Sequence, residues 1–485
     1  MKHSDKAELS RDTLCKKTDE TGTAWREMGA FLQNDALCVR AYAPDAAVSL
    51  VGDFNDWNPD AHPLTPETGD ADVWSLLLPR DTVKEGQRYK LCLRDGGGER
   101  WIPDPYARRL QALPDTASEL CYLSGYAWRD AGWLQYRQRS VDRKSGTLPP
   151  VSVYRMSVRG WFGRADGGRY GYSELADELA VYAKQLGCTH VELDDVVGTR
   201  PESPLVVGAY APDARYGTPY EFMAFVDRMH EAGVGVLLNL SDLRRQTNAS
   251  RQARELAVGC SAFWAEQYHV DGARLPRELA GKVRDVAPND LLLYTDTPDG
   301  SGILLGSEAQ EGAIASLPRD ESDRAAMRLW AAEAWFCSPH RVLRAGDEID
   351  FNGVTRLERI LLESRESRQW QLFAATLGHA YLQAPALYED FPMKRIERQT
   401  PDGGRLILLK RKHRDGRTVS VILNTGVLPA CLSWEETGIA NAIRLFDTAD
   451  ERFGGRGGTH VEEAYVLLPP MSAVALAGDD RFDVQ

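Results

Sequence analysis

The segments VSVYRMSV (151–158), YSELADELAVYAKQLG (172–187) and HVELDDV (190–196) decide the fold of the middle of this chain. The first and third are short, valine-containing runs typical of buried strands. Between them, apolar residues recur every three to four positions, the period of an amphipathic helix. The alternation continues through YEFMAFVDRMHEAG (220–233) and VGVLLNLS (234–241). Strands that alternate with helices predict parallel βα units, so we expect a (β/α)8 TIM barrel over residues 126–395.

The second half of this barrel pattern is incomplete. Strands are still indicated by HVDGARL (269–275) and DLLLYTD (290–296). The following GILLGSEAQEGAIASLPRD (302–320) is too short for two full βα units, and clear helical periodicity returns only at RAAMRLWAAEAWF (324–336). We therefore expect a degenerate barrel that lacks part of its wall.

The segments before and after the predicted barrel show a different pattern of apolar residues. Residues 37–123 and the chain after residue 405 consist of short alternating runs separated by Gly, Pro and Asp, which is the pattern of antiparallel β-sandwiches. The predicted organisation is a flexible arm at 1–25, an immunoglobulin-like β-sandwich at 26–125, the barrel at 126–395 and a C-terminal β-sandwich at 396–485.

Composition narrows the classes of partner. The formal net charge is −13 and the pI is near 5.3, so nucleic acid and anionic lipid are disfavoured as partners. The eight cysteines include no C-x-x-C pair, which argues against a metal site or a disulfide framework. No run approaches the roughly 18 apolar residues of a membrane span. These features predict a cytoplasmic protein without a metal or cofactor.

Three residues of the first sandwich suggest a carbohydrate site. Trp57, Lys90 and Trp101 fall on successive strands and turns of the same small domain. Indole faces stack on the C–H faces of a pyranose, and an ammonium group can donate hydrogen bonds to its hydroxyls. Tryptophan in a sandwich can equally be part of the core, so the residues alone leave both interpretations open.

The order FNDWN, YK, W and DPYA resembles the glycogen-binding modules of carbohydrate-binding module family 48. In such modules the sugar-contacting residues correspond to Trp57, Lys90 and Trp101. The resemblance therefore implies that the first sandwich binds an α-glucan such as glycogen or starch.

The barrel segments quoted above, together with GAYAPDARYG (208–217), resemble the glycogen branching enzymes of glycoside hydrolase family 13. The resemblance implies a retaining mechanism, in which one carboxylate attacks the anomeric carbon and a second, about 5–5.5 Å away, protonates the leaving oxygen. Those groups lie at the carboxyl ends of barrel strands.

On the strand at 269–275 the family pattern is Asp-x-x-Arg-x-Asp, and its last aspartate is the nucleophile. Asp271 and Arg274 match this pattern, but Pro276 occupies the nucleophile's position. Proline has no group that can form a glycosyl ester. We expect Asp271 and Arg274 to remain as an ion pair at the barrel rim, because deleting one member of a buried pair strands the other charge.

The remaining family positions are also largely replaced. The general acid falls on Asp296, which is one methylene shorter than the family's glutamate, and only 24 positions separate it from Asp320, where branching enzymes carry a much longer segment. The other positions fall on Asn239, Arg244, Arg319, Asp320 and Pro204. Acids that could substitute if the loops have moved are Asp242, Glu278, Asp299 and Glu321.

The sequence thus predicts a catalytically inactive, branching-enzyme-like protein that binds α-glucan, with no catalytic residues expected. It would act as a scaffold or accessory factor in glycogen metabolism, with an active branching enzyme or another glycogen enzyme as a candidate partner. Two alternatives stay open. One is a divergent branching enzyme or glucanohydrolase that uses relocated carboxylates, and the other is a protein-interaction module that does not bind glucan.

Overall fold

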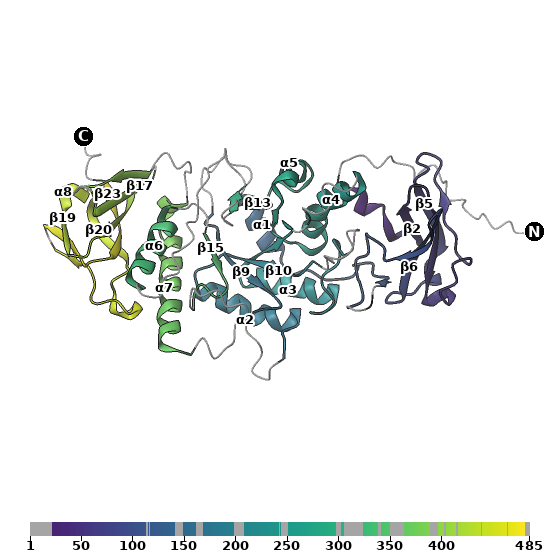
Figure 1. Cartoon of the computed structure of the whole chain (residues 1–485), viewed down its shortest axis with the longest axis horizontal. Coiled ribbons are helices and arrows are strands. Elements are labelled where there is room, and N and C mark those ends of the chain that lie inside the picture. The colour runs from purple at the N-terminus through teal and green to yellow at the C-terminus, as the bar shows by residue number, and fades with distance from the viewer. Residues whose placement is uncertain are drawn as a thin grey trace, which may run out of the picture.

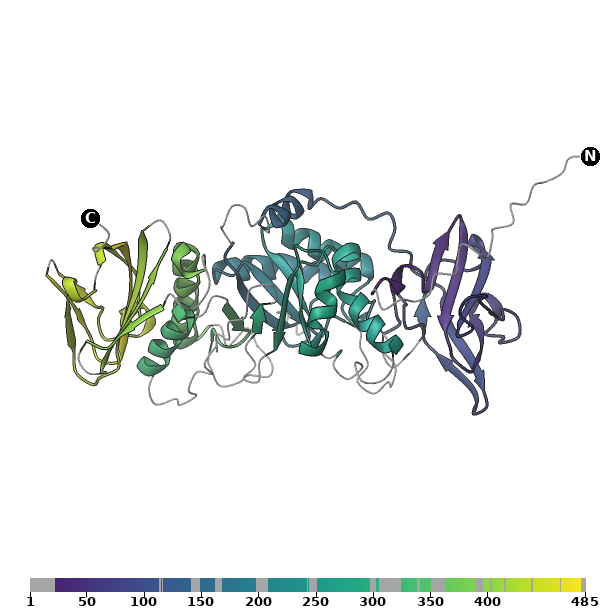
Figure 2. The ribbon, with the colours of Figure 1, turned by 90° about the horizontal axis from the view of Figure 1, so that it is seen from above.

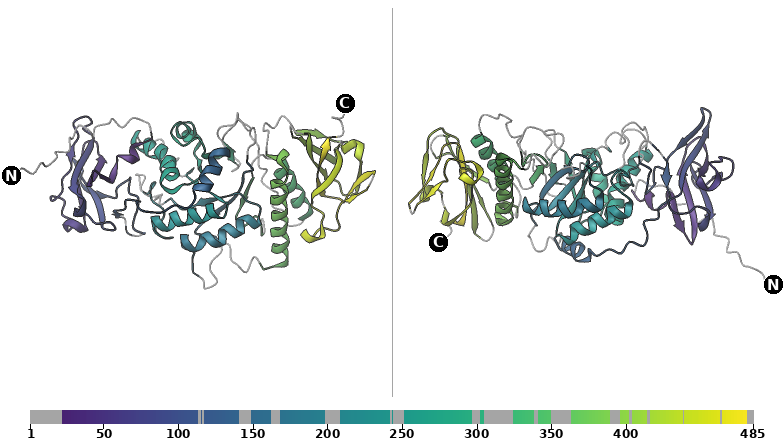
Figure 3. Two further views of the ribbon diagram at one scale, coloured as in Figure 1. Left: turned by 180° about the vertical axis from the view of Figure 1, so that it is seen from behind. Right: turned by 90° about the horizontal axis from the view of Figure 1, so that it is seen from below.

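The chain folds into three bodies arranged in a row, with the N-terminal and the C-terminal body at opposite ends (Figure 1). All views show the same order, with the barrel-like body between two β-sandwiches (Figure 3). This computed structural model describes residues 22–112, 115, 117–140, 149–161, 168–197, 208–241, 243, 251–296, 302–304, 324–337, 341–349, 363–388, 396–401, 404–413, 416–437, 439–462 and 464–480.

The N-terminal body is a sandwich of two antiparallel sheets. Its core lies between the sheets and is formed by residues such as Val39, Leu50 and Leu91. One sheet has the order β1 (Gly29–Gln33), β2 (Ala36–Tyr42), β5 (Val73–Pro79), β4 (Thr65–Pro66). The other has the order β3 (Ala47–Gly52), β6 (Arg88–Asp95), β7 (Gly98–Ile102), with β8 (Ser118–Glu119) also paired to β6.

The middle body is built on one seven-stranded sheet that curls into part of a barrel. Its order is β14 (Gly302–Leu304), β13 (Leu292–Asp296), β12 (Gly272–Leu275), β11 (Gly235–Asn239), β10 (His190–Asp194), β9 (Ser152–Ser157), β15 (Arg341–Arg344). The strands from β9 to β13 and β15 run parallel, whereas β14 is antiparallel to β13. The predicted degenerate barrel is therefore confirmed, because a short returning strand follows β13 where a further parallel βα unit would continue the wall.

Helices cover this sheet, and two of them lie where the sequence period predicted helices, over residues 172–187 and 220–233. In α3 (Pro219–Glu231) Thr218 caps the amino end in a capping box with Glu221, and Phe222, Val226 and Met229 are buried along one face. The other covering helices are α1 (Ala131–Ser140), α2 (Tyr172–Gln185), α4 (Arg251–Tyr268) and α5 (Arg277–Val286). None of the helices in the described parts of the chain is long and apolar enough to cross a membrane.

The close spacing of β12 and β13 depends on one glycine. A Cβ added to Gly272 would stand 2.0 Å from the carbonyl oxygen of Leu292, far inside van der Waals contact. This explains why the sequence has glycine directly after Asp271, since any side chain there would push the two strands apart.

The C-terminal body is the predicted second β-sandwich. Helices α6 (Arg324–Cys337) and α7 (Arg365–Leu382) stand between it and the barrel (Figure 1) and share one hydrophobic core with it. The larger sheet has the order β16 (Ile396–Gln399), β17 (Leu406–Lys412), β18 (Arg417–Asn424), β23 (Ser472–Asp480), β20 (Ile439–Asp447). The smaller sheet has the order β19 (Ala430–Ser433), β22 (Tyr465–Leu468), β21 (His460–Val461). The domain boundaries at residues 126 and 396 stay predictions.

The N-terminal sandwich is packed directly on the barrel. Trp25 is 5% exposed and meets the ring of Phe263 in α4 edge to face, with 5.2 Å between ring centroids, and Tyr106 stacks on Tyr210 at 5.4 Å. The predicted loose arm therefore cannot extend as far as residue 25, because the Trp25 indole gains apolar burial here. Residues 1–21 of the predicted arm lie outside the described residues.

Candidate functional site

The N-terminal sandwich brings its two candidate tryptophans together on an outer face. Trp57 lies in the turn after a short 3-10 helix (Asp53–Asn55), and Trp101 lies on β7 opposite Cys92 of β6. Their rings are nearly parallel, with centroids 6.0 Å apart and an angle of 10° between planes. Lys90 is two residues before Cys92 on β6 and so points to the same side of the sheet. We call Trp57, Lys90 and Trp101 the sugar platform.

Pro276, the residue predicted at the family's nucleophile position, lies directly between a strand and a helix. Strand β12 ends at Leu275 and α5 begins at Arg277, so Pro276 joins them with no intervening loop. Pro276 is buried, and its carbonyl oxygen accepts a hydrogen bond from the Leu279 amide at 3.0 Å. Glu278, one of the candidate substitutes, lies exposed in the first turn of α5.

Arg274 pairs with acids that sequence reasoning missed. Its Nε donates to Glu192 Oε1 on β10 at 2.8 Å, and its Nη2 lies 3.4 Å from Asp194 Oδ1. Arg155 of β9 approaches the same two carboxylates, at 3.4 Å and 3.5 Å. The tyrosine hydroxyl of Tyr294 on β13 also donates to Glu192. Asn239 Nδ2 of β11 donates to Asp194 Oδ1 at 2.5 Å. The carboxyl-end cluster consists of Arg155, Glu192, Asp194, Asn239, Arg274 and Tyr294.

The charges of the carboxyl-end cluster are matched. The carboxylates of Glu192 and Asp194 face the guanidinium groups of Arg155 and Arg274, so the four charges cancel. Glu192 is fully buried, and burial raises its pKa above the ordinary value although Arg274 and Arg155 oppose that shift. The arrangement suits a structural link across the five strands β9 to β13 better than attack on a sugar.

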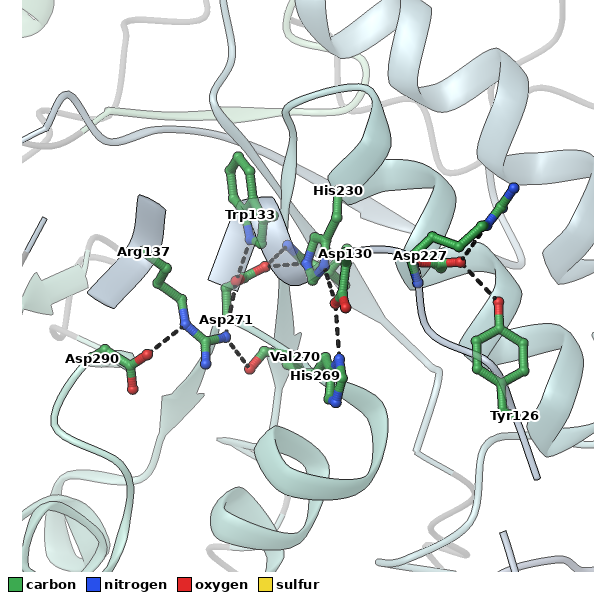
Figure 4. A network of polar contacts seen from close by, with 12 residues as sticks. Tyr126, Asp130, Trp133, Arg137, Asp227, His230, His269, Val270, Asp271 and Asp290 are labelled. Atoms are coloured by element: carbon green, nitrogen blue, oxygen red, sulfur yellow. Dashed lines mark hydrogen bonds and ion pairs between the residues drawn. The ribbon is translucent and has the colours of Figure 1, made fainter. Parts of the chain in front are cut away.

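The expected ion pair between Asp271 and Arg274 is wrong. Asp271 immediately precedes β12 at the amino end of the barrel, and its carboxylate meets Trp133, Arg137 and His230 instead (Figure 4). Two residues three apart along a strand point to opposite faces and stand about 10 Å apart, so they cannot pair directly.

A network of polar contacts links α1 to the amino end of the barrel. We call it the amino-end network, and it consists of Asp130, Trp133, Arg137, His230 and Asp271. His230 is buried between two carboxylates, with its Nδ1 2.9 Å from Asp130 and its Nε2 2.9 Å from Asp271 (Figure 4). Burial alone would lower the pKa of His230, but the carboxylates of Asp271 and Asp130 raise it to about 9. Burial likewise would raise the pKa of Asp271, and His230 and Arg137 hold it well below its usual range.

The connection between the sandwich and α1 runs along the outside of the barrel (Figure 2). Asp227 of α3 holds this connection, because it accepts hydrogen bonds from the Tyr126 hydroxyl at 3.2 Å and from the Arg129 amide at 3.0 Å (Figure 4). The amino-end network and Asp227 therefore fix the segment that leads from the sandwich to the barrel.

The other predicted positions are less informative. Asp296 is the last residue of β13 and pairs in register with Gly302 of β14, but its side chain lies outside the described part. The remaining family positions and candidate substitutes that lie outside the described residues are Pro204, Asp242, Arg244, Asp299, Arg319, Asp320 and Glu321.

Comparison with known proteins supports a relation to glucan enzymes. Residues 25–107 match the model of carbohydrate-binding module 48, the isoamylase N-terminal domain. A 1,4-alpha-glucan branching enzyme GlgB from Burkholderia thailandensis is 38% identical over 344 residues, which is 61% of this chain and 39% of that protein. The enzyme of the same name from Jannaschia sp. is 31% identical over 311 residues, covering 55% and 42% respectively. The matches thus span less than half the length of these curated relatives.

Solved structures share the fold. The product complex of SpuA, a multi-modular glycogen-degrading pneumococcal virulence factor, superposes with a TM-score of 0.68 at 13% identity, covering 96% of this chain and 72% of that one. A putative alpha amylase from Salmonella typhimurium superposes with a TM-score of 0.64 at 17% identity, covering 93% and 99%. These likenesses establish an amylase-like architecture for the chain.

Proposed function

We propose that this chain, a homologue of the 1,4-alpha-glucan branching enzymes that carries a carbohydrate-binding module 48 domain, binds α-glucan without transferring glycosyl units. Binding would occur on the sugar platform of the N-terminal sandwich. The curled middle body would serve as a scaffold, and the protein would act as an accessory factor that stays on glycogen near active enzymes. Fold alone does not assign chemistry, so the proposal depends on the sites.

One observation is the main support for a loss of glycosyl transfer. Pro276, the residue predicted at the nucleophile's position, has no carboxylate and joins β12 directly to α5, so no βα loop follows the strand there. The acids of the carboxyl-end cluster, Glu192 and Asp194, are both engaged by Arg155 and Arg274. Double displacement needs one ionised carboxylate facing the anomeric carbon and an acid about 5–5.5 Å away. The carboxyl-end cluster offers no such free pair among the described residues.

Retention in glycogen tests the binding half of the proposal. The double substitution Trp57→Ala, Trp101→Ala is expected to weaken binding by more than about tenfold, because each indole supplies on the order of 1–2 kcal/mol of apolar contact. Mobility in native gels with and without glycogen measures this effect. Leu77→Ala is the matched control, since Leu77 is an exposed apolar residue (41%) on the opposite sheet. Equal retardation of the wild type and the double variant would favour the module that does not bind glucan.

The proposed absence of glycosyl transfer is tested by long incubation of the protein with amylose. We expect no new α-1,6 linkages by debranching and chain-length profiling, and no change in iodine staining. Trapping a covalent glycosyl adduct on the purified protein would instead support the divergent enzyme with relocated carboxylates, and the labelled residue would identify its nucleophile.

Pro276→Asp is expected not to restore glycosyl transfer. An aspartate at this position precedes the first turn of α5, so its carboxylate would accept a hydrogen bond from a backbone amide of that turn as a helix cap rather than face a sugar. The cap contributes about 1 kcal/mol, and the loss of proline rigidity costs about 0.4–1 kcal/mol, so the melting temperature should change little. Appearance of branching activity in this variant would show that the rest of the site is intact.

A further inference from the structure

Both indole N–H groups of the sugar platform are held by carboxylates of the same domain. Trp101 Nε1 donates to Glu99 Oε1 at 2.7 Å, and Trp57 Nε1 donates to Asp53 Oδ1 at 3.2 Å. The two tryptophans lie on separate segments, a strand and a turn, yet each has an acid within four residues that accepts its only hydrogen-bond donor. The ring N–H groups are therefore already occupied before any sugar arrives.

Each of these carboxylates is itself fixed by an arginine. Asp53 receives two hydrogen bonds from the Arg88 guanidinium, at 2.8 Å and 2.9 Å, and one from the Arg88 amide at 3.0 Å. Glu99 Oε2 accepts from Arg94 Nε at 3.0 Å, and Arg94 continues to Asp60 at 2.7 Å. A bidentate arginine sets the direction of a carboxylate as well as its charge. The result is two relays, each running from an arginine through an acid to an indole.

The electrostatics of the relays keep both acceptors ionised. The hydrogen bond from Arg88 lowers the pKa of Asp53 below its ordinary value. The indole N–H of Trp101, followed by the guanidinium of Arg94, lowers the pKa of Glu99. Both carboxylates thus remain able to accept the indole hydrogen bonds at neutral and mildly acidic pH.

The ring geometry shows how a glucan can contact the pair. Two aromatic faces that sandwich a sugar ring must stand roughly 7–8 Å apart, because carbon atoms in contact are separated by about 3.5–4.0 Å. The centroids of Trp57 and Trp101 are 6.0 Å apart, so no sugar ring fits between them. The ligand has to lie over the open surface of the pair, and Trp101 is 38% exposed.

We propose that Asp53 and Glu99 are positioning residues of the sugar platform, which fix the two indoles in their near-parallel arrangement so that recognition of a neutral α-glucan runs through the ring faces. This inference rests on the proposed function. Its physical basis is preorganisation, because an indole that is already fixed does not lose rotational freedom when the glucan binds.

Replacing Glu99 tests the inference. Glu99→Ala is expected to raise the Kd for maltoheptaose about threefold to tenfold, the cost of ordering one side chain at binding. Glu99→Gln is expected to stay within about twofold of the wild type, because its amide oxygen can still accept the Trp101 hydrogen bond. Titration calorimetry on the full chain measures both. Arg80→Ala is the matched control, since it removes an exposed ion pair with Asp35 at the end of the other sheet, away from the sugar platform.

A spectroscopic readout separates positioning from general destabilisation. Two near-parallel indoles in close contact give a coupled circular-dichroism signal, which Glu99→Ala should weaken and Glu99→Gln should retain. Unchanged maltoheptaose affinity in Glu99→Ala would overturn the inference while leaving the proposed function in place. Absence of any binding by the wild type would instead overturn the proposed function, and the coupled signal alone would then decide whether Glu99 holds the indole.

Discussion

Replacing His230 by glutamine is expected to lower the free energy of unfolding by about 3–5 kcal/mol near pH 6.5. The substitution removes the buried cation that lies 2.9 Å from both Asp130 and Asp271, so each of these carboxylates loses a positively charged partner in the protein interior. Arg137 still contacts Asp271 at 3.1 Å, but Asp130 keeps only His269. The contacts between α1 and the amino end of the barrel should therefore be the first to open.

The effect of His230→Gln should depend on pH with a defined sign. The pKa of His230 is raised from 6.5 to about 9 in the folded state, so its stabilisation is complete below about pH 6.5 and is lost as the pH rises through about 9. The shift corresponds to about 3 kcal/mol. The difference in stability between wild type and variant should shrink over this range.

Urea unfolding between pH 6 and 10 measures this difference, and hydrogen exchange of the Val236 amide, which donates to Asp271 at 2.6 Å, reports on the network directly. His379→Gln provides a control, because His379 is exposed and its ring lies 3.2 Å from the Gln185 carbonyl oxygen rather than between buried carboxylates. A penalty for His230→Gln that is below about 1 kcal/mol, or that is constant with pH, would contradict a protonated His230.

Replacing Arg274 by methionine is expected to cost a similar 3–5 kcal/mol, because it leaves Glu192 buried with Arg155 as its remaining cation. The double substitution Arg274→Met, Glu192→Leu should recover most of this loss, since a buried pair exchanged for apolar groups of similar size is often close to neutral. Thermal unfolding of Arg274→Met, Glu192→Leu and the double variant, compared with the wild type, gives a double-mutant cycle.

The same variants connect the carboxyl-end cluster to function. If the cluster is a structural tie, all three variants keep their retention in glycogen, because the sugar platform lies in a different body of the chain. Additive losses in the single and double variants would show that Arg274 and Glu192 do not depend on each other, against the 2.8 Å contact between them.

The sequence by itself determined the order of the three bodies and the incomplete barrel. Apolar periodicity placed α2, α3 and the strands around them, and the short stretch after Asp296 indicated that full βα units were missing there. These features are local, because strand and helix periods are properties of consecutive residues. The resemblance to carbohydrate-binding modules also selected Trp57 and Trp101, which the fold brings to a stacked arrangement.

Only the tertiary structure decided which charges meet. The sequence suggested an ion pair between Asp271 and Arg274, whereas Asp271 precedes β12 at the amino end of the barrel and Arg274 lies near the carboxyl end of that strand, on its other face. Their true partners, His230 and Glu192, are 41 and 82 positions away in the sequence. Side-chain direction alternates along a strand, and contacts between strands join residues from distant segments, so no local pattern could have identified either partner.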